Sequence, residues 1–420
     1  MRLLLVSHSF PLPAHDGGRI GFFNSVKYLA RTHQVGVVCL AEHSEEAPVA
    51  ELERHCSFVR VFRRKPGGDS LRLIRGIVLD PPGALAKYSY PAAGQLIRDA
   101  VRAFRPDIVE FHHLHTAIYQ QFSQGVLTVL REHNVEYKVW ERYAGNASGW
   151  VEKRYTKWTT PRMRRYEAEA ALRFDRCVVV SPADAEWLRA VAPAARIEVI
   201  PSGVDTEYFF PFVGMPEEAF SMTITGSFAW GPKQQSLWSL LTKVFPKIKA
   251  KVPEATLYVV GKGMPEELQR LGATIPGVKI TGPLLDVRPY IARSALLINY
   301  LESGGGIALK VLEAMAMRKP VLSNSLGCEG IPMTHGQDLC VADGPEVFAT
   351  AAARLLRDES ERRRLAASGY QRVLQEYSWH VIAGRLESVY ETLLETRRAL
   401  WAARQSAQSG LEKKDGHAAD

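Results

Sequence analysis

A regular alternation of short apolar segments with helical stretches limits the possible fold of this chain more than any other feature. One series begins at residue 3, and a second starts at residue 222 after a stretch with the prolines and glycine of a domain connection. Such alternation is typical of parallel sheets that carry helices on both faces. We therefore expect an α/β protein with two doubly wound sheets in tandem. The expected strands are residues 3–7, 35–40, 108–111, 126–131, 177–181 and 197–201 in the first half, and 222–225, 256–260, 278–280, 296–299 and 321–324 in the second.

The length of the chain also indicates two domains, because 420 residues exceed what one hydrophobic core usually supports. The expected division is a first domain over residues 1–200, a linker over 201–211, a second domain over 212–378, a helix over 379–403 and a disordered tail over 404–420. In doubly wound folds, ligands bind beyond the carboxyl ends of the strands. With two such domains, we expect the binding site in the cleft between them.

Composition narrows the class of protein. Hydrophobic residues make up 46% of the chain and charged residues 23%, which is ordinary for a soluble globular protein. The five cysteines are odd in number and lack CxxC spacing, which favours reduced thiols over a disulfide framework or structural zinc. The apolar run at residues 3–6 is too short for a signal-peptide core, and no apolar run reaches the roughly 18 residues of a membrane span. We therefore expect a cytoplasmic protein.

The net charge of +8 and the pI near 9.2 favour an anionic partner. Basic residues concentrate at residues 60–75 and 153–165, where apolar and aromatic residues lie among them. This mixture suits the surface of a membrane that carries anionic lipid, which would make the protein peripheral on the inner face of the membrane. The alternative is a solvated face and a loop. A nucleic-acid partner is disfavoured because no recognised nucleic-acid module accompanies the charge.

The segment 302–320, ESGGGIALKVLEAMAMRKP, has the pattern of a phosphate seat. Gly304, Gly305 and Gly306 precede a helical pattern, and backbone N–H groups at the start of a helix bind anions well where no Cβ intervenes. Lys310 and Glu313 are three residues apart and so share one face of that helix. The lysine suits a phosphate and the carboxylate suits ribose hydroxyls. The alternative is a glycine turn before an ordinary core helix.

A group of histidines follows two of the expected strands. Residues 108–115 read IVEFHHLH, and residues 131–136 read REHNVE. Histidines at strand ends can face a cleft as hydrogen-bond donors or bases, and His112 and His133 are the best placed. A structural role is the alternative for any single member. We do not expect a metal site, because the three histidines between residues 112 and 115 cannot all converge on one ion.

Three further loops end expected strands. Gly17 and Gly18 lie in a loop that lacks the GxGxxG spacing of a dinucleotide site, which disfavours nicotinamide chemistry. Lys233 closes the loop 225–233, and Gly261 and Gly263 belong to the loop 259–263. Each of these loops is expected to border the same cleft.

Together these motifs resemble those of the family 4 retaining glycosyltransferases of the GT-B fold. The resemblance covers nearly the whole chain, since the motifs share one order. They are the glycine pair at 17–18, His112, His133, the linker IPSGVDTEYF, the loop GKG, the helix KVLEAMAMRKPVL and the closing YSW at 377–379. The pairing of EHNVEY with SGGGIALKVLEAMAM is similar to bacterial sugar transferases of surface-polysaccharide clusters, including those associated with exosortase systems.

The resemblance implies two Rossmann-like domains and a hexosyltransferase that moves a sugar from a nucleoside diphosphate sugar with retention at the anomeric carbon. No metal or other cofactor is implied. The second domain would bind the donor, and the first would bind a lipid-linked or polysaccharide acceptor. The implied catalytic residues are His112, His133, Lys233 and Lys310. The implied donor-binding residues are Gly17, Gly18, Gly261, Gly263, Gly304, Gly305, Gly306, Lys310 and Glu313.

The chain departs from the family pattern at two positions. The family usually has a second carboxylate eight residues before the one that matches Glu313. Here that position is Gly305, and the sequence leaves open whether Glu302 takes the place of that carboxylate. Ser227 stands where the family has an arginine, and Lys233 is one residue away from the position of the family's lysine in the same loop. Two other functions therefore stay open: a GT-B epimerase that acts on a nucleotide sugar, and a non-catalytic protein that binds one.

Overall fold

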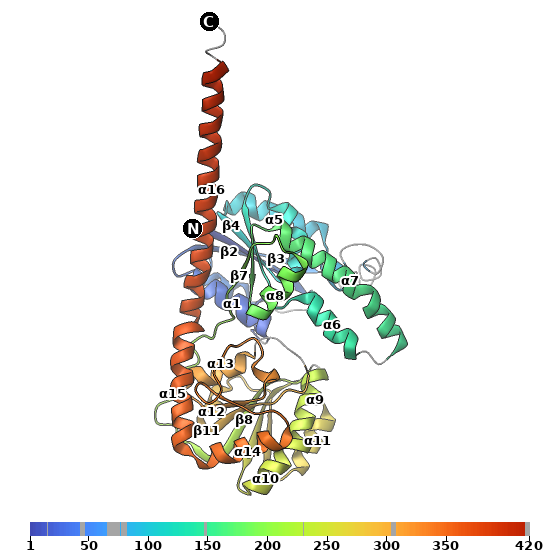
Figure 1. Cartoon of the computed structure of the whole chain (residues 1–420), viewed down its shortest axis with the longest axis vertical. Coiled ribbons are helices and arrows are strands. Elements are labelled where there is room, and N and C mark those ends of the chain that lie inside the picture. Colours follow the sequence, from blue (N-terminus) through green and yellow to red (C-terminus); the bar gives the residue numbers. More distant parts are fainter. Residues whose placement is uncertain are drawn as a thin grey trace.

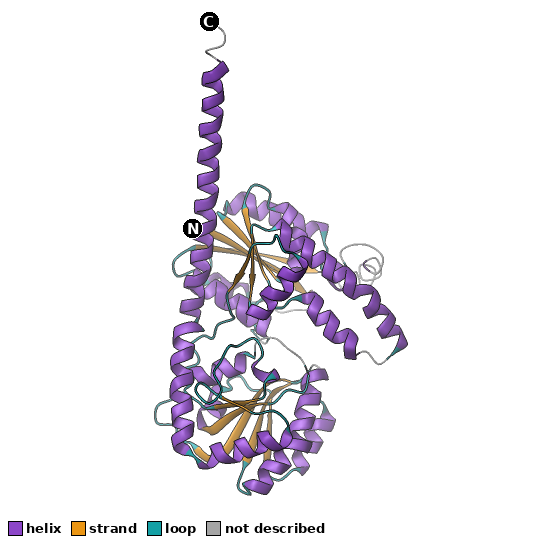
Figure 2. Ribbon diagram, in the orientation of Figure 1, coloured by secondary structure: helices purple, strands orange, loops and turns teal. Residues whose placement is uncertain are grey.

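A computed structural model of the chain contains two parallel sheets, each covered by helices (Figure 1). It describes residues 1–14, 16–42, 47–64, 76, 82–146, 149–229, 231–303 and 308–415. Figure 2 shows the two sheets one above the other, with helices packed around each. The expected α/β architecture of two doubly wound domains is confirmed.

The N-terminal sheet has seven strands in the order β3-β2-β1-β4-β5-β6-β7, and each neighbouring pair is parallel. Its inner strands are apolar because both faces of the sheet are covered. The strands are β1 (Arg2–Ser7), β2 (Gln34–Glu42), β3 (Phe58–Arg64), β4 (Ile108–His112), β5 (Leu127–Arg131), β6 (Arg176–Val179) and β7 (Ile197–Val199). The helices are α1 (Gly17–Leu29), α2 (Val49–Glu53), α4 (Gly83–Ala86), α5 (Pro91–Phe104), η1 (Leu114–Phe122), α6 (Glu136–Asn146), α7 (Trp150–Arg173) and α8 (Pro182–Val191).

The C-terminal sheet has six parallel strands in the order β10-β9-β8-β11-β12-β13. The strands are β8 (Glu218–Ser227), β9 (Thr256–Lys262), β10 (Val278–Gly282), β11 (Ser294–Asn299), β12 (Val321–Ser323) and β13 (Cys340–Val341). The helical segments are α9 (Gly231–Ser239), η2 (Leu240–Val244), α10 (Phe245–Lys251), α11 (Glu266–Thr274), α12 (Arg288–Arg293), α13 (Leu309–Ala316), η3 (Leu326–Cys328), α14 (Pro345–Arg357), α15 (Glu359–Glu376) and α16 (Trp379–Asp415).

Two strands were missing from the sequence prediction. The edge strand β3 combines apolar residues with Arg60, Arg63 and Arg64, and it contains the start of the basic cluster that we interpreted as a membrane surface or a solvated face. Arg64 is buried and forms an ion pair of 2.7 Å with Glu42 on β2. This part of the cluster therefore belongs to a sheet edge, while residues 65–75 lie outside the described residues. The other missing strand, β13, has only two residues.

The last helix, α16, leaves the C-terminal domain and packs against the N-terminal one (Figure 1). Trp379, Leu386 and Tyr390 belong to the same apolar core as the first strand β1. The helix continues to Asp415, beyond residue 403, where we expected it to end before a disordered tail. The N-terminal core is thus completed by the end of the chain.

The linker at 201–211 is attached to both domains. The carboxylate of Asp205 lies 2.6 Å from Nζ of Lys27 and accepts a hydrogen bond of 2.8 Å from the hydroxyl of Tyr28, both on α1. The N–H of Val204 donates to the carbonyl of Tyr377, which precedes α16. The linker and α16, which both connect the two domains, therefore contact α1. The first turn of α1 lies at the site described below.

All five cysteines are free thiols, as expected. Within the described part of the chain, no helix is long and apolar enough to cross a bilayer.

Candidate functional site

The site is built where the first turn of α1 meets the first turn of α13. Asp16 caps α1, and its side chain accepts a hydrogen bond of 3.0 Å from the N–H of Arg19. A Cβ built on Gly17 would lie 3.7 Å from Cδ1 of Leu309, the first residue of α13. Each helix follows a strand that ends toward the other domain. Loops from both sheets therefore border one cleft, as the alternating sequence pattern predicted.

Lys310 and Glu313 lie on the first turns of α13 and are partly buried. Burial, together with the nearby charge of Lys233, lowers the pKa of Lys310 to about 8. Burial raises the pKa of Glu313 to about 7, although the charge of Lys310 opposes this shift. Nζ of Lys310 would lie 3.2 Å from a Cβ on Gly226, so the ammonium group is placed at the end of β8. The predicted cation and carboxylate therefore share one desolvated region.

Lys233 faces the same region from the start of α9. Burial lowers its pKa, and the carboxylate of Asp16 on the other domain opposes that shift. Two ammonium groups, those of Lys233 and Lys310, thus influence each other across a short distance. Two cations held together in this way favour the binding of an anion, which would relieve their repulsion.

The expected glycines differ in what the structure says of them. Gly261 has a φ of +151°, and a Cβ there would collide with the carbonyl oxygen of Gly226 on the neighbouring strand. Gly263 has a φ of +72°, and a Cβ there would lie 2.8 Å from Cβ of Ala229. Both glycines are therefore required by the packing of the strand ends, whether or not they touch a ligand. Gly304, Gly305 and Gly306 lie outside the described residues.

Glu302, the residue considered as a replacement for the missing family carboxylate, is held by contacts with other side chains. Its carboxylate accepts a hydrogen bond from the hydroxyl of Ser239 and lies 3.5 Å from Nζ of Lys243. Its backbone N–H donates to the hydroxyl of Ser236. These contacts hold Glu302 against α9 and η2.

The N-terminal side of the cleft carries five histidines at the ends of β1, β4 and β5. His112 is fully buried, with Nε2 2.7 Å from Glu110 and Nδ1 3.2 Å from Nε2 of His133. The ring of His133 stacks on that of His113 at 4.2 Å, and Nε2 of His113 would lie 2.9 Å from a Cβ on Gly18. His112 is therefore one layer below the cleft, and His113 is the residue that contacts the glycine pair.

A cavity of about 380 Å³ opens beside these histidines. Its lining is mostly polar, and it combines carboxylates, guanidinium groups and imidazoles. The lining residues are His8, Ser9, Asp16, Gly18, Arg19, Glu42, Arg64, Tyr88, His113, His115, Asn134 and Glu136. Burial raises the pKa of Glu136 to about 7. The cavity can therefore offer both donors and acceptors to a polar ligand with several hydroxyl groups.

Residues 16–208 match the family model for glycosyltransferase family 4, and residues 219–358 match the model for glycosyl transferases group 1. The chain is a family 4 glycosyltransferase. The two matches correspond to the two domains, and the gap between them, residues 209–218, begins within the linker.

Relatives and solved structures agree with the glycosyltransferase assignment. An uncharacterised 44.6 kDa protein in the cps region of Klebsiella pneumoniae is 22% identical over 387 residues, which cover 90% of this chain and 96% of that protein. The phosphatidyl-myo-inositol mannosyltransferase of Mycolicibacterium smegmatis is 26% identical over 224 residues, or 51% of this chain and 57% of that protein.

Two solved structures share the fold over almost the whole chain. Sucrose-phosphate synthase from Thermosynechococcus elongatus has a TM-score of 0.69 at 18% identity and covers 94% of this chain and 100% of its own. The Anabaena protein HepE, solved with UDP and glucose, has a TM-score of 0.66 at 17% identity and covers 93% of this chain and 100% of its own. The glycosyltransferase therefore has the GT-B fold that its sequence motifs implied.

The sequence analysis singled out neither His8 nor Glu136 of this glycosyltransferase, and it ranked His113 and His115 below His112 and His133. His8 follows β1, which pairs with β4 so that Ser7 and His112 are partners in register. The predicted strand ends alone did not say which strands are neighbours. The order of strands in a doubly wound sheet, with β1 beside β4, would have placed His8 next to the other histidines.

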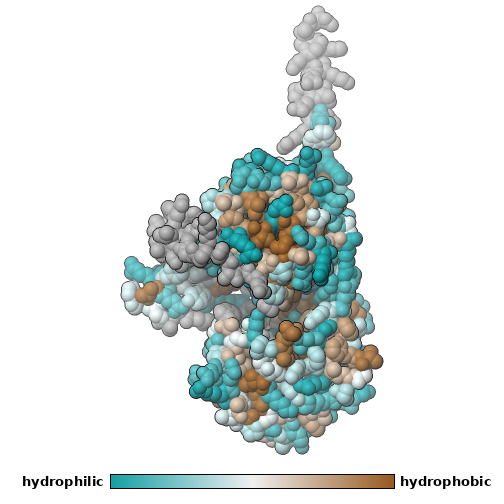
Figure 3. All heavy atoms as spheres, turned by 180° about the vertical axis from the view of Figure 1, so that it is seen from behind, coloured by the Kyte–Doolittle hydropathy of each residue, from teal (hydrophilic) through white to brown (hydrophobic). Residues whose placement is uncertain are grey.

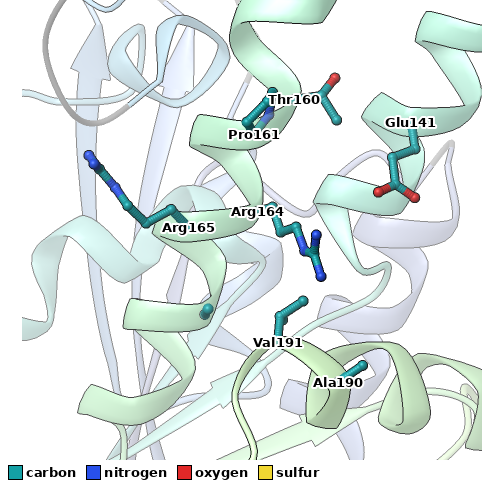
Figure 4. Close-up of a pocket in the computed structure, with 8 residues that line it drawn as sticks. Glu141, Thr160, Pro161, Arg164, Arg165, Ala190 and Val191 are labelled. Carbon is teal, nitrogen blue, oxygen red and sulfur yellow. The ribbon is translucent and has the colours of Figure 1, made fainter.

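A second hollow of about 530 Å³ lies between α6, α7 and α8 of the glycosyltransferase. Figure 4 shows Arg164 of α7 pointing toward Val191 of α8, with Glu141 of α6 opposite and Arg165 turned away. No residue predicted for the site lines it within the described chain.

Proposed function

We propose that this glycosyltransferase moves a hexose from a nucleoside diphosphate sugar to a lipid-linked or polysaccharide acceptor, with retention and without a metal in the transfer step. The product would enter a bacterial cell-surface glycan. The observation that carries the proposal is the meeting of the α1 and α13 first turns, with Lys310 and Lys233 beside them.

The charge of the leaving group explains why these residues suit the reaction. As the glycosidic bond breaks, the diphosphate gains negative charge, and prearranged cations stabilise that charge in a desolvated site. Lys310 and Lys233 are proposed to take this role. Glu313, three residues after Lys310 on the same helix, is proposed to accept hydrogen bonds from the ribose hydroxyls. The cavity beside the histidines is proposed to hold the acceptor.

Relatives support the proposed substrates by their own named activities. One is described as a GDP-mannose-dependent mannosyltransferase that acts on a phosphatidylinositol mannoside, and HepE was solved with UDP-glucose. The Klebsiella relative comes from a cps region, which supports a role in polysaccharide synthesis. These descriptions of the related proteins are consistent with a nucleotide-sugar donor and a glycan or lipid acceptor.

Calorimetry with a panel of nucleoside diphosphate sugars, including UDP-glucose and GDP-mannose, tests donor binding. We expect saturable binding of at least one donor, weaker binding in Glu313→Ala and slower turnover in Lys310→Ala. Lys247→Ala is the matched control, since Lys247 lies on α10 in an exposed ion pair with Glu346. The absence of saturable binding across the panel would refute the proposal, and NMR of the product anomer tests retention.

Two other functions are separated by product analysis. A GT-B epimerase would return an epimer of the intact donor without an acceptor. A non-catalytic binding protein would bind the donor with no turnover against a panel of cell-envelope lipids that contains the acceptor. Gly305 in place of the family carboxylate is the feature that motivates the second alternative.

We also propose that α7 docks the enzyme on the inner face of the cytoplasmic membrane. In Figure 1, α6 and α7 form a helical hairpin that projects from the N-terminal domain. Trp150, Val151 and Trp158 on α7 have 76%, 62% and 55% of their surface exposed. The exposed side chains of Lys153, Arg154 and Lys157 lie among them. Apolar anchors with neighbouring cations are the pattern of a surface that binds anionic lipid. In the view from behind, hydrophobic surface shows at the projecting end of the hairpin among hydrophilic residues (Figure 3).

A further inference from the structure

Three imidazoles converge in the proposed acceptor cavity from two neighbouring strands. His8 follows β1, and His113 and His115 follow β4. The sequence argument against a metal considered His112, His113 and His115 together. The structure turns His112 away toward Glu110 and brings His8 into the group instead. The objection that three histidines on one strand exit cannot converge therefore does not apply to this set.

The spacing of the three side chains is close to that of a metal site. One nitrogen from each ring can be chosen so that all three atoms lie within 4.8 Å of one another. For atoms so spaced, a point exists within about 2.8 Å of each, and Zn²⁺ requires about 2.0–2.1 Å to a histidine nitrogen. Each nitrogen would need to move by less than about 1 Å, which small side-chain rotations provide.

Unused hydrogen-bonding capacity points to a missing ligand in the same place. Nδ1 of His8 and Nδ1 of His115 are buried and have no hydrogen-bond partner. A buried polar atom without a partner is costly, so such an atom usually signals an ion or a water.

Two of the three carboxylates that line the cavity are already paired with cations. Asp16 is engaged by Arg19, and Glu42 forms an ion pair with Arg64, so these cavity carboxylates are already matched by cations. Three nitrogen ligands with an open fourth position are typical of zinc sites that bind a further ligand. His113 is supported from behind by its stacking on His133.

We propose that His8, His113 and His115 bind one Zn²⁺ ion, with the fourth position open to the acceptor cavity. This site is separate from the lysines proposed for the leaving diphosphate, and it stands whether or not the proposed donor and acceptor are correct.

Zinc binding to the full, untagged protein tests the site directly. The probe is Zn²⁺ alone, titrated against a competing chromophoric chelator, with the bound metal counted by elemental analysis. We expect one equivalent in the unaltered protein. Loss of one ligand should weaken binding by about a hundredfold or more, because even the loss of a supporting outer contact costs 10–100-fold. The test variants are His8→Gln and His115→Gln, which keep the side chains polar and similar in reach.

His380→Gln is the matched control, because His380 is an exposed histidine on α16. Thermal unfolding without zinc checks that each variant folds, and zinc should raise the melting temperature of the unaltered protein and the control only. Co²⁺ should also give the visible absorption of a nitrogen-ligated ion in those two proteins. Less than one equivalent of bound zinc in the unaltered protein would overturn the proposal. Equal affinity in the two test variants and the control would overturn it as well, because the zinc would then be bound elsewhere.

Discussion

Tyr390 on the C-terminal helix donates a hydrogen bond to the buried carboxylate of Glu110, although the two residues are 280 positions apart. Burial alone would raise the pKa of Glu110, but His112, Arg131 and Tyr390 together hold that pKa below its ordinary value. An ionised Glu110 faces Nε2 of His112, so the ring N–H is best placed there. Nδ1 of His112 is then the acceptor toward His133. The end of the chain thus helps to set the orientation of histidines beside the cleft.

Tyr390→Phe removes one donor from this buried carboxylate. A hydrogen bond to a charged group contributes about 1.5–3 kcal/mol, so we expect the free energy of unfolding to fall by about 2 kcal/mol. Urea unfolding measures this loss. The control is the same change in a Glu110→Gln background, where the charge is absent and the further loss should be below about 1 kcal/mol. Strictly additive losses would show that the two residues are not coupled.

Gly18→Ala tests the close approach between α1 and His113. The new Cβ would lie 2.9 Å from Nε2 of His113, so the imidazole must shift. Gly384→Ala is the matched control, since it is also helical and its Cβ would meet no atom within 4 Å. Alanine in a helix is favoured over glycine by about 0.5–1 kcal/mol. The control should therefore gain stability, whereas Gly18→Ala should not gain it and should slow sugar transfer. Equal gains in stability with full transfer activity in both variants would contradict the predicted contact.

The pKa values of Glu313 and Lys310 predict how stability depends on pH. Because the folded-state pKa of Glu313 is raised to about 7, folding retains its proton, and stability falls as pH rises from about 4.5 to 7. Because the pKa of Lys310 is lowered to about 8, stability rises again as pH increases from about 8 to 10.5. This pair therefore costs the most stability between about pH 7 and 8, where both groups are charged.

Glu313→Gln removes the acidic part of that cost. At pH 7.5 the variant should be more stable than the unaltered protein by about 1–2 kcal/mol, because the buried charge is gone. At pH 5.5 the difference should be smaller, because Glu313 is then largely protonated in the folded protein, although the unfolded chain is already mostly ionised. Urea unfolding at the two pH values measures both. A difference that is the same at pH 5.5 and pH 7.5 would show that burial does not shift the pKa of Glu313.

The strands predicted from the sequence are those whose own residues show that they are buried. A parallel strand covered on both faces must be apolar along its length, so runs such as those of β1 and β11 were visible in the sequence. The edge strand β3 was not, because three of its seven residues are arginines and the ion pair of Arg64 with Glu42 on β2 depends on the neighbouring strand. The packing of α16 on the N-terminal core was not visible either, since an amphipathic helix does not identify the surface that it covers.

The sequence analysis identified the segments that form the candidate site better than it identified the individual residues. The motif around Lys310 and Glu313 and the loop at Gly17 and Gly18 were identified, and the structure brings these segments together. The histidine beside Gly18 is His113, whereas His112, which we expected to face the cleft, is buried at the end of β4. Alternation along a strand decides which of two adjacent side chains faces the cleft, and a shift of one residue reverses that choice.

Vesicle flotation tests the proposed membrane surface of α7. We expect the protein to float with vesicles that contain phosphatidylglycerol and to be released at high salt, because basic residues near an anionic surface contribute about 1 kcal/mol each. Lys153→Ala combined with Lys157→Ala should therefore weaken binding about thirtyfold. Trp150→Ser should weaken it further by removing an apolar anchor.

The matched control is Leu285→Ser, because Leu285 is a fully exposed apolar residue on the C-terminal domain. Salt matters because the Debye length falls to about 3 Å at 1 M, which screens exposed charges. Binding that ignores lipid charge, or that Leu285→Ser weakens as much as Trp150→Ser does, would place the membrane contact elsewhere.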